Sequence, residues 1–101
     1  LFIEDLDEYL YHIDRMLMNV KRNGLFKDLA GLIVGGMTDM HDNEIPFGKT
    51  AEEILLDCVS EYDFPVVFNF PAGHLDDNRT MILGRKVTLE VGEIRSKITF
   101  L

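Results

Sequence analysis

The chain is poor in basic residues, has a single cysteine and contains no long apolar run. It has 10 Lys and Arg residues and 18 Asp and Glu residues, which gives a formal net charge of −8. A chain this acidic is a poor candidate for binding nucleic acid or an anionic membrane, so we expect no nucleic acid and no membrane among its partners. The longest apolar stretches, such as Leu29–Val34, are also far shorter than a membrane span.

The single cysteine, Cys58, excludes an internal disulfide. It falls on the apolar face of a predicted helix, where a small buried hydrophobic side chain is the usual role. A free thiol is compatible with a reducing compartment, and we expect a cytoplasmic protein. No signal peptide is visible. The chain begins with Leu1, however, and its first residues already have the pattern of a strand, so we expect that a segment upstream has been removed.

The composition is that of one globular domain, with 47% hydrophobic and 28% charged residues in 101 positions. Short apolar runs alternate with amphipathic segments along the first part of the chain. The runs predict strands at Leu1–Ile3, Gly31–Val34 and Val66–Phe70, the second of them ended by Gly35 and Gly36. This order predicts an α/β fold, in which a small mixed sheet has parallel strands joined by two helices.

Two amphipathic segments predict the helices. In the first, apolar residues recur at steps of three and four, at Leu6, Leu10, Ile13, Leu17 and Val20. Asp5 or Asp7 would cap its start, and Gly24 would end it. The second helix starts at Thr50, because Thr50 and Glu53 have the spacing of a capping box. Its predicted buried face consists of Ile54, Leu55, Cys58, Val59 and Tyr62.

The last part of the chain has a different pattern. Thr80–Leu83 and Lys86–Val91 flank a turn at Gly84, and they predict a C-terminal antiparallel β hairpin. Ile94–Leu101 would add a last strand. We see no linker, so residues 1–101 are expected to form a single domain.

Residues that can carry chemistry follow each of the three predicted parallel strands. Glu4 follows the first, the pair Gly35 and Gly36 the second, and His74 the third, at the end of the turn FPAGH. Working groups in open α/β sheets gather past the carboxyl ends of the strands, so an acid and an imidazole could share one edge. A carboxylate bound to one imidazole nitrogen leaves the other nitrogen free to take a proton from a nucleophile.

The same residues also have plainer interpretations. A loop histidine is usually only a polar surface residue, and a carboxylate before a helix is more often a cap than a catalytic group. The chain also offers no obvious nucleophile. Ser60 lies in the second predicted helix and Ser96 in the tail, neither in a Gly-x-Ser-x-Gly turn, while Thr38 would need a special base arrangement.

A metal site is the other alternative. Residues 39–44, DMHDNE, include side chains of the kinds that bind metals. Their spacing matches no established metal motif. We therefore expect a solvated acidic loop there, with no metal ligands and no cofactor in the chain.

Four stretches together resemble the C-terminal domain of the LD-carboxypeptidases, the serine peptidase family that also includes the microcin C immunity proteins. They are LFIEDLDEYLYHIDRML, GLIVGGMTD, IPFGKTAEEILLD and PVVFNFPAGHLDDNRTMILGRKVTL. The resemblance covers nearly the whole chain in order. Its most specific pieces are the acid in FIED and the P-x-G-H turn.

The resemblance implies a two-domain enzyme of which this chain is the C-terminal half. The N-terminal domain, absent here, would supply a nucleophilic serine. The glutamate and histidine of the family match Glu4 and His74, with Asp5 and Glu8 as alternatives for the acid. The implied substrate is a murein tetrapeptide, cleaved at the amide before its terminal D-alanine, although some relatives cleave peptidyl-nucleotide antibiotics. A homodimer is also implied.

Two functions therefore remain open at this point. As half of an enzyme, the isolated chain is expected to be inactive. As a module on its own, it would bind a peptide without cleaving it. The sequence does not decide between lysine and diaminopimelate before the scissile bond.

Overall fold

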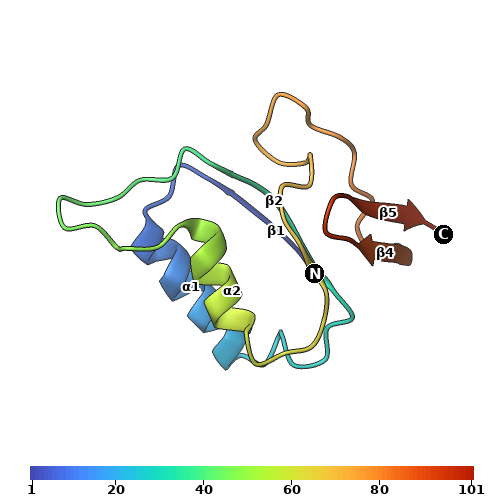
Figure 1. Cartoon of the computed structure of the whole chain (residues 1–101), viewed down its shortest axis with the longest axis horizontal. Helices are drawn as coiled ribbons and strands as arrows, with labels where there is room; N and C mark the ends of the chain where they lie inside the picture. The colour runs from blue at the N-terminus through green and yellow to red at the C-terminus, as the bar shows by residue number, and fades with distance from the viewer.

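The computed structural model describes residues 1–101 and confirms the predicted fold class. The elements in chain order are β1 (Phe2–Leu6), α1 (Leu10–Arg22), β2 (Leu32–Thr38), α2 (Ala51–Val59), β3 (Val66–Val67), β4 (Val87–Val91) and β5 (Ser96–Phe100). The first three strands form a parallel sheet in the order β1-β2-β3, and β4 and β5 form a separate antiparallel hairpin. Figure 1 shows both helices on one side of the parallel sheet and the hairpin on the other.

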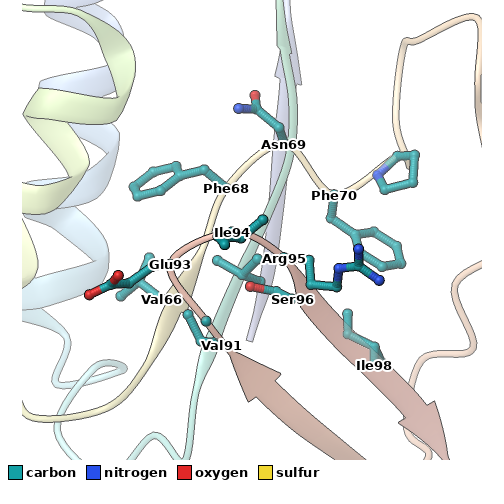
Figure 2. A pocket seen from close by; sticks show the side chains of 13 residues that line it. Val66, Phe68, Asn69, Phe70, Val91, Glu93, Ile94, Arg95, Ser96 and Ile98 are labelled. Atoms are coloured by element: carbon teal, nitrogen blue, oxygen red, sulfur yellow. The ribbon is translucent and has the colours of Figure 1, made fainter.

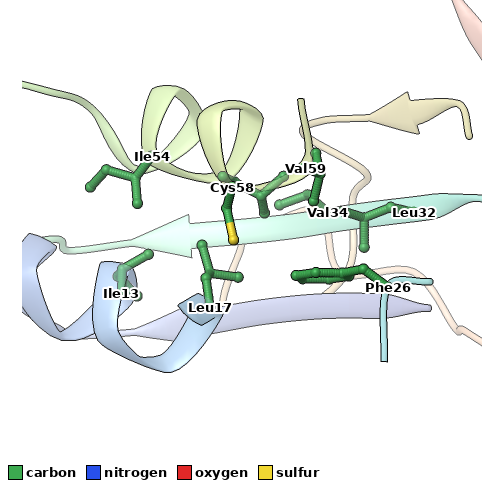
Figure 3. Packing of buried hydrophobic residues seen from close by; sticks show 9 residues of the cluster. Ile13, Leu17, Phe26, Leu32, Val34, Ile54, Cys58 and Val59 are labelled. Atoms are coloured by element: carbon green, nitrogen blue, oxygen red, sulfur yellow. The ribbon is translucent and has the colours of Figure 1, made fainter. Parts of the chain in front are cut away.

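The hydrophobic core lies between the two helices and the helix-facing side of β2 (Figure 3). Its nine buried members are Ile13, Leu17, Phe26, Leu32, Val34, Ile54, Leu55, Cys58 and Val59. Phe26 is fully buried although it lies in the loop after α1, so this loop folds back under the sheet. Cys58 is buried and free, as the sequence predicted. Neither helix is long and apolar enough to cross a membrane.

The start of α1 differs from the prediction. Leu6 belongs to β1, where it pairs with Thr38, because the strand continues through the acidic residues. Asp7 then turns the chain with a φ of +59°, and Tyr9 takes the N-cap position with no side-chain cap. The carbonyl of His41, from the next loop, accepts the N–H of Leu10 at 2.9 Å. A main-chain group distant in sequence therefore replaces the predicted aspartate cap.

The other helix boundaries follow the sequence. Basic residues occupy the last turn of α1, and Gly24 follows its end with a φ of +73°. The hydroxyl of Thr50 accepts the N–H of Glu53 at 3.2 Å, and the Glu53 carboxylate accepts the N–H of Thr50 at 3.1 Å, which completes the capping box. Tyr62 lies beyond the end of α2 but still packs on the core.

Strand β2 does not end at Gly35 and Gly36, as predicted, but runs through them to Thr38. Ile3 pairs with Val34 and Asp5 with Met37, so Glu4 alone faces both glycines. This is a β-bulge, which lets a paired strand accommodate an extra residue and continue. Its position opposite Glu4 matters for the site described below.

The later strands were partly mispredicted. Only Val66–Val67 of the predicted third strand pairs with β2. Residues 80–83 form no strand, and β4 pairs with β5 around a turn at residues 92–95. In that hairpin Leu89 faces Ile98 and Val87 faces Phe100. Both β4 and β5 alternate apolar and polar residues, so their apolar side chains pair on one face. The run Met81-Ile82-Leu83 has no such alternation, so β5 is the better partner for β4.

Candidate active site

Glu4 and His74 are in contact although 70 positions separate them in sequence. The Nδ1 atom of His74 lies 2.9 Å from Oε2 of Glu4. Ile3 packs on the core beneath the helices, so its neighbour Glu4 points to the opposite face of the sheet. The segment that carries His74 crosses this same face after β3, on the side of the sheet away from the helices (Figure 1).

The two glycines of the bulge make room for the segment that carries His74. Gly36 donates its N–H to the carbonyl of Ala72 at 3.0 Å. A Cβ atom on Gly36 would lie 2.8 Å from Cγ of Leu75, and one on Gly35 would lie 3.0 Å from the ring of Phe2 and closer still to the Ala72 carbonyl. Side chains at these two positions would therefore lift the segment off the sheet.

Gly73 brings the imidazole onto the carboxylate. Its φ is +106°, a conformation that residues with a Cβ atom rarely adopt. A Cβ atom there would lie 2.6 Å from Oε2 of Glu4 and 3.1 Å from Cβ of Glu4. The turn thus needs glycine for two reasons, its backbone conformation and the closeness of Glu4.

The contact sets the tautomer of the imidazole. An ionised carboxylate only accepts hydrogen bonds, so Nδ1 of His74 carries the hydrogen and Nε2 of the neutral ring is free to accept a proton. The His74 side chain is 54% exposed and that of Glu4 is 26% exposed, so the free nitrogen is open to a reactant while the carboxylate is more sheltered. This pair can accept a proton and stabilise the resulting imidazolium.

The alternative acids do not contact His74. Asp5 points to the other face of the strand, and its carboxylate accepts the N–H of Leu6 at 2.8 Å. Glu8 contacts Nδ1 of His12 at 2.9 Å. Of the acids weighed from the sequence, only Glu4 reaches His74.

No hydroxyl of the chain hydrogen-bonds the His74 ring. The Ser60 hydroxyl donates to the carbonyl of Asp57 at the end of α2, and Ser96 lies in β5. The Thr38 hydroxyl donates to the main-chain carbonyl of His74 at 2.8 Å and forms no hydrogen bond with the imidazole. The chain thus brings together a carboxylate and an imidazole, and no hydroxyl is bonded to the ring.

The acidic loop does not form a metal centre. No group of three or more His, Cys, Asp or Glu side chains has the geometry to hold a metal ion. His41 pairs with Asp7, and Asp42 accepts the N–H of Phe47 at 3.0 Å. His41 and Asp42 therefore have separate partners and do not converge on one point.

A pocket of about 530 Å³ lies between β3 and the tip of the hairpin (Figure 2). Its wall includes Val66, Phe68, Phe70, Val91 and Arg95, but neither Glu4 nor His74. Its lining is mainly apolar on the β3 side. We therefore place the candidate site at the acid–imidazole pair, because that pair has defined chemistry.

Sequence reasoning missed two side chains that support the turn. Oδ1 of Asn78 accepts the N–H of Gly73 at 3.0 Å, and Thr38 holds the carbonyl of His74. The sequence presented Thr38 only as a nucleophile that would need a special base arrangement, and no motif marked Asn78. Next to Asn78, Arg79 forms two hydrogen bonds of 3.0 Å with Asp77, and they lower the pKa of that carboxyl from its ordinary value.

Comparison with known proteins shows the family to which the chain belongs. A family model described as the LD-carboxypeptidase C-terminal domain matches residues 1–89. A Bacillus subtilis (strain 168) protein named "Probable murein peptide carboxypeptidase" is 34% identical over 97 residues, which cover 92% of this chain and 29% of that protein. The murein tetrapeptide carboxypeptidase of Pseudomonas aeruginosa is 25% identical over 94% of this chain and 30% of its own length.

Solved structures of two proteins are also similar to this chain. A crystal structure of muramoyltetrapeptide carboxypeptidase from Oxalobacter formigenes matches 99% of this chain with a TM-score of 0.86 and 26% identity, over 35% of its own chain. The microcin C7 self-immunity protein MccF shares the fold, with a TM-score of 0.57 and 23% identity over 70% of this chain and 21% of its own. The chain thus spans about a third or less of the length of these four proteins. On the family match and these relatives, the chain belongs to the family of LD-carboxypeptidase C-terminal domains.

Proposed function

We propose that this chain is the C-terminal catalytic half of a serine LD-carboxypeptidase. Its function would be to supply the base, His74, and the acid that orients it, Glu4. The nucleophilic serine would come from an N-terminal domain outside this chain. The observation that supports the proposal most directly is the 2.9 Å contact between Glu4 and His74. These residues are 70 positions apart, so only folding brings them together.

The chemistry proposed for His74 follows from its tautomer. Nε2 takes the proton of the serine hydroxyl while the serine oxygen attacks the carbonyl carbon of the scissile amide. The same nitrogen then gives the proton to the leaving amine, and the C–N bond breaks to leave an acyl-enzyme. Water, activated in turn by Nε2, hydrolyses the ester and regenerates the serine. Throughout, Glu4 holds Nδ1–H and stabilises the positive charge of the ring.

The proposed substrate is a murein tetrapeptide, and the proposed product is free D-alanine. Two relatives carry names that refer to murein peptides or murein tetrapeptide, which supports this class. A cytoplasmic location is part of the proposal and is supported by the free, buried thiol of Cys58, which suits a reducing compartment.

The test is D-alanine release from murein tetrapeptide by the protein that contains both domains. His74→Ala and Glu4→Gln should lower kcat by about 10³-fold to 10⁴-fold or more, because a glutamine favours the wrong tautomer and an alanine removes the base. The matched control is His12→Ala, since His12 has the same kind of carboxylate partner but lies on α1. Full activity of His74→Ala would refute the proposal.

The isolated chain offers a second test. A base without its nucleophile contributes no acylation, so residues 1–101 alone should release no D-alanine. Turnover by this chain that a serine-directed inhibitor blocks would contradict the proposed division of residues between two domains. Tight binding of murein peptide by the whole protein without any release would favour the peptide-binding module instead.

A further inference from the structure

The orientation of the His74 ring depends on its main chain more than on packing. The side chain is 54% exposed, and the only hydrogen bond of the ring is the one that Nδ1 donates to Glu4. A ring held at one atom can still tilt or withdraw if the backbone beneath it moves. The groups that fix the backbone of residues 72–74 therefore decide where Nε2 points.

Three consecutive residues of the turn each have one main-chain group held from outside it. The carbonyl of Ala72 accepts the N–H of Gly36 at 3.0 Å. The N–H of Gly73 donates to Oδ1 of Asn78 at 3.0 Å. The carbonyl of His74 accepts the hydroxyl of Thr38 at 2.8 Å. The first bond is between backbone groups, but the other two depend on particular side chains.

The two side chains come from different parts of the fold. Thr38 is the last residue of β2, and its pairing with Leu6 in β1 makes it part of the sheet that also carries Glu4. Asn78 lies in the loop that follows the turn, and the bond of 2.7 Å from the N–H of Arg79 to the carbonyl of Pro71 closes that loop. Thr38 thus holds the peptide group that follows the His74 Cα atom, and Asn78 holds the peptide group that precedes the Gly73 Cα atom.

We propose that Thr38 and Asn78 are positioning residues that hold the imidazole of His74 in its reactive orientation. The inference rests on the proposed function, in which His74 is the base. Neither side chain hydrogen-bonds the ring, so we assign neither of them a catalytic role. Their hydroxyl and amide oxygen act through the main chain, by fixing the angle at which the ring leaves the turn.

Substitutions that remove one hydrogen bond each test the proposal in the whole enzyme. Thr38→Val keeps the shape of the side chain without its hydroxyl, and Asn78→Ala removes the acceptor. A misplacement of about 1 Å can cost about 10²-fold in rate, so each variant should lower kcat about 10-fold to 100-fold with KM little changed. The matched variants Thr38→Ser and Asn78→Asp keep the hydroxyl and the acceptor oxygen, so they should retain most of the kcat of the parent enzyme.

A second readout does not depend on activity. The ¹⁵N signals of the His74 ring report how far Nδ1 carries the hydrogen, and in Thr38→Val and Asn78→Ala they should move toward those of a free, exchanging imidazole. Unchanged kcat in both variants would overturn the proposal. If Thr38→Val failed to fold, Asn78→Ala, in an exposed loop, would decide alone.

The two readouts also separate this inference from the proposed function. Loss of activity in His74→Ala with full activity in both variants would refute the positioning role only. Full activity of His74→Ala would refute the proposed function, and the ring signals would then decide whether the two side chains position the imidazole at all. Unchanged ring signals would refute that as well.

Discussion

Replacing Gly73 by alanine should damage catalysis far more than it damages stability. The new Cβ atom would lie 2.6 Å from Oε2 of Glu4, so the carboxylate must move by about 0.9 Å to reach an ordinary contact of about 3.5 Å. That movement breaks or bends the 2.9 Å bond to Nδ1 of His74. In the proposed enzyme Glu4 orients His74. Because losing the orienting carboxylate of a triad costs up to about 10⁴-fold, we expect kcat of that enzyme to fall about 10²-fold to 10⁴-fold.

The stability cost has a different origin and can be measured separately. Alanine at a φ of +106° costs about 1–3 kcal/mol in the folded state. The pair of Glu4 and His74 is partly exposed, so its loss adds less than about 1 kcal/mol. Gly48→Ala is the matched control, since Gly48 has a φ of +90° but an added Cβ atom there meets nothing within 4 Å.

The assay compares both variants in urea unfolding and in D-alanine release. We expect similar losses of unfolding free energy in Gly73→Ala and Gly48→Ala, and a loss of kcat in Gly73→Ala alone. Equal activity of the two variants would refute the argument that the turn needs glycine to bring the imidazole onto Glu4. A structure of Gly73→Ala that kept the bond at 2.9 Å would refute it too.

Three further predictions concern the rest of the chain. Thr50→Ala should cost about 1 kcal/mol of unfolding free energy because it removes the capping box with Glu53, whereas Thr50→Ser should cost little. Burial raises the pKa of the Cys58 thiol, so iodoacetamide should label it slowly in the native chain and quickly in urea; rapid native labelling would contradict this. The hydrogen bond from Arg79 lowers the pKa of Asp77 in the folded state, so its small contribution to stability is present above about pH 4 and is lost as the pH falls through the lowered pKa. Urea unfolding of Asp77→Asn should therefore differ from the parent near neutral pH and converge with it in acid.

Much of the fold could be predicted because the relevant forces are local. The capping box at Thr50 was recognised from spacing, since its two hydrogen bonds join residues three positions apart. The apolar faces of both helices and the burial of Cys58 followed from helical periodicity. The alternation after residue 86 also predicted a C-terminal hairpin, although it named the wrong partner strand.

The errors occurred where a distant segment replaces a local signal. The carbonyl of His41 serves the first turn of α1, so no aspartate cap was needed. Pairing with β1 carries β2 through Gly35 and Gly36, which local propensity would make a strand end. The residues beside α1 do not indicate that the His41 carbonyl serves its first turn. The residues after Val34 do not indicate a bulge.

The sequence by itself determined which residue types stand at the candidate site, an acid after the first apolar run and a histidine on a glycine turn after the third. Only the tertiary structure decided that Glu4, and neither Asp5 nor Glu8, contacts His74. The physical reason is strand geometry, because successive side chains alternate between the faces of a sheet and only one face lies under the turn. Thr38 and Asn78 also acquire their places only in the folded chain, because folding brings them to the main chain of residues 73 and 74.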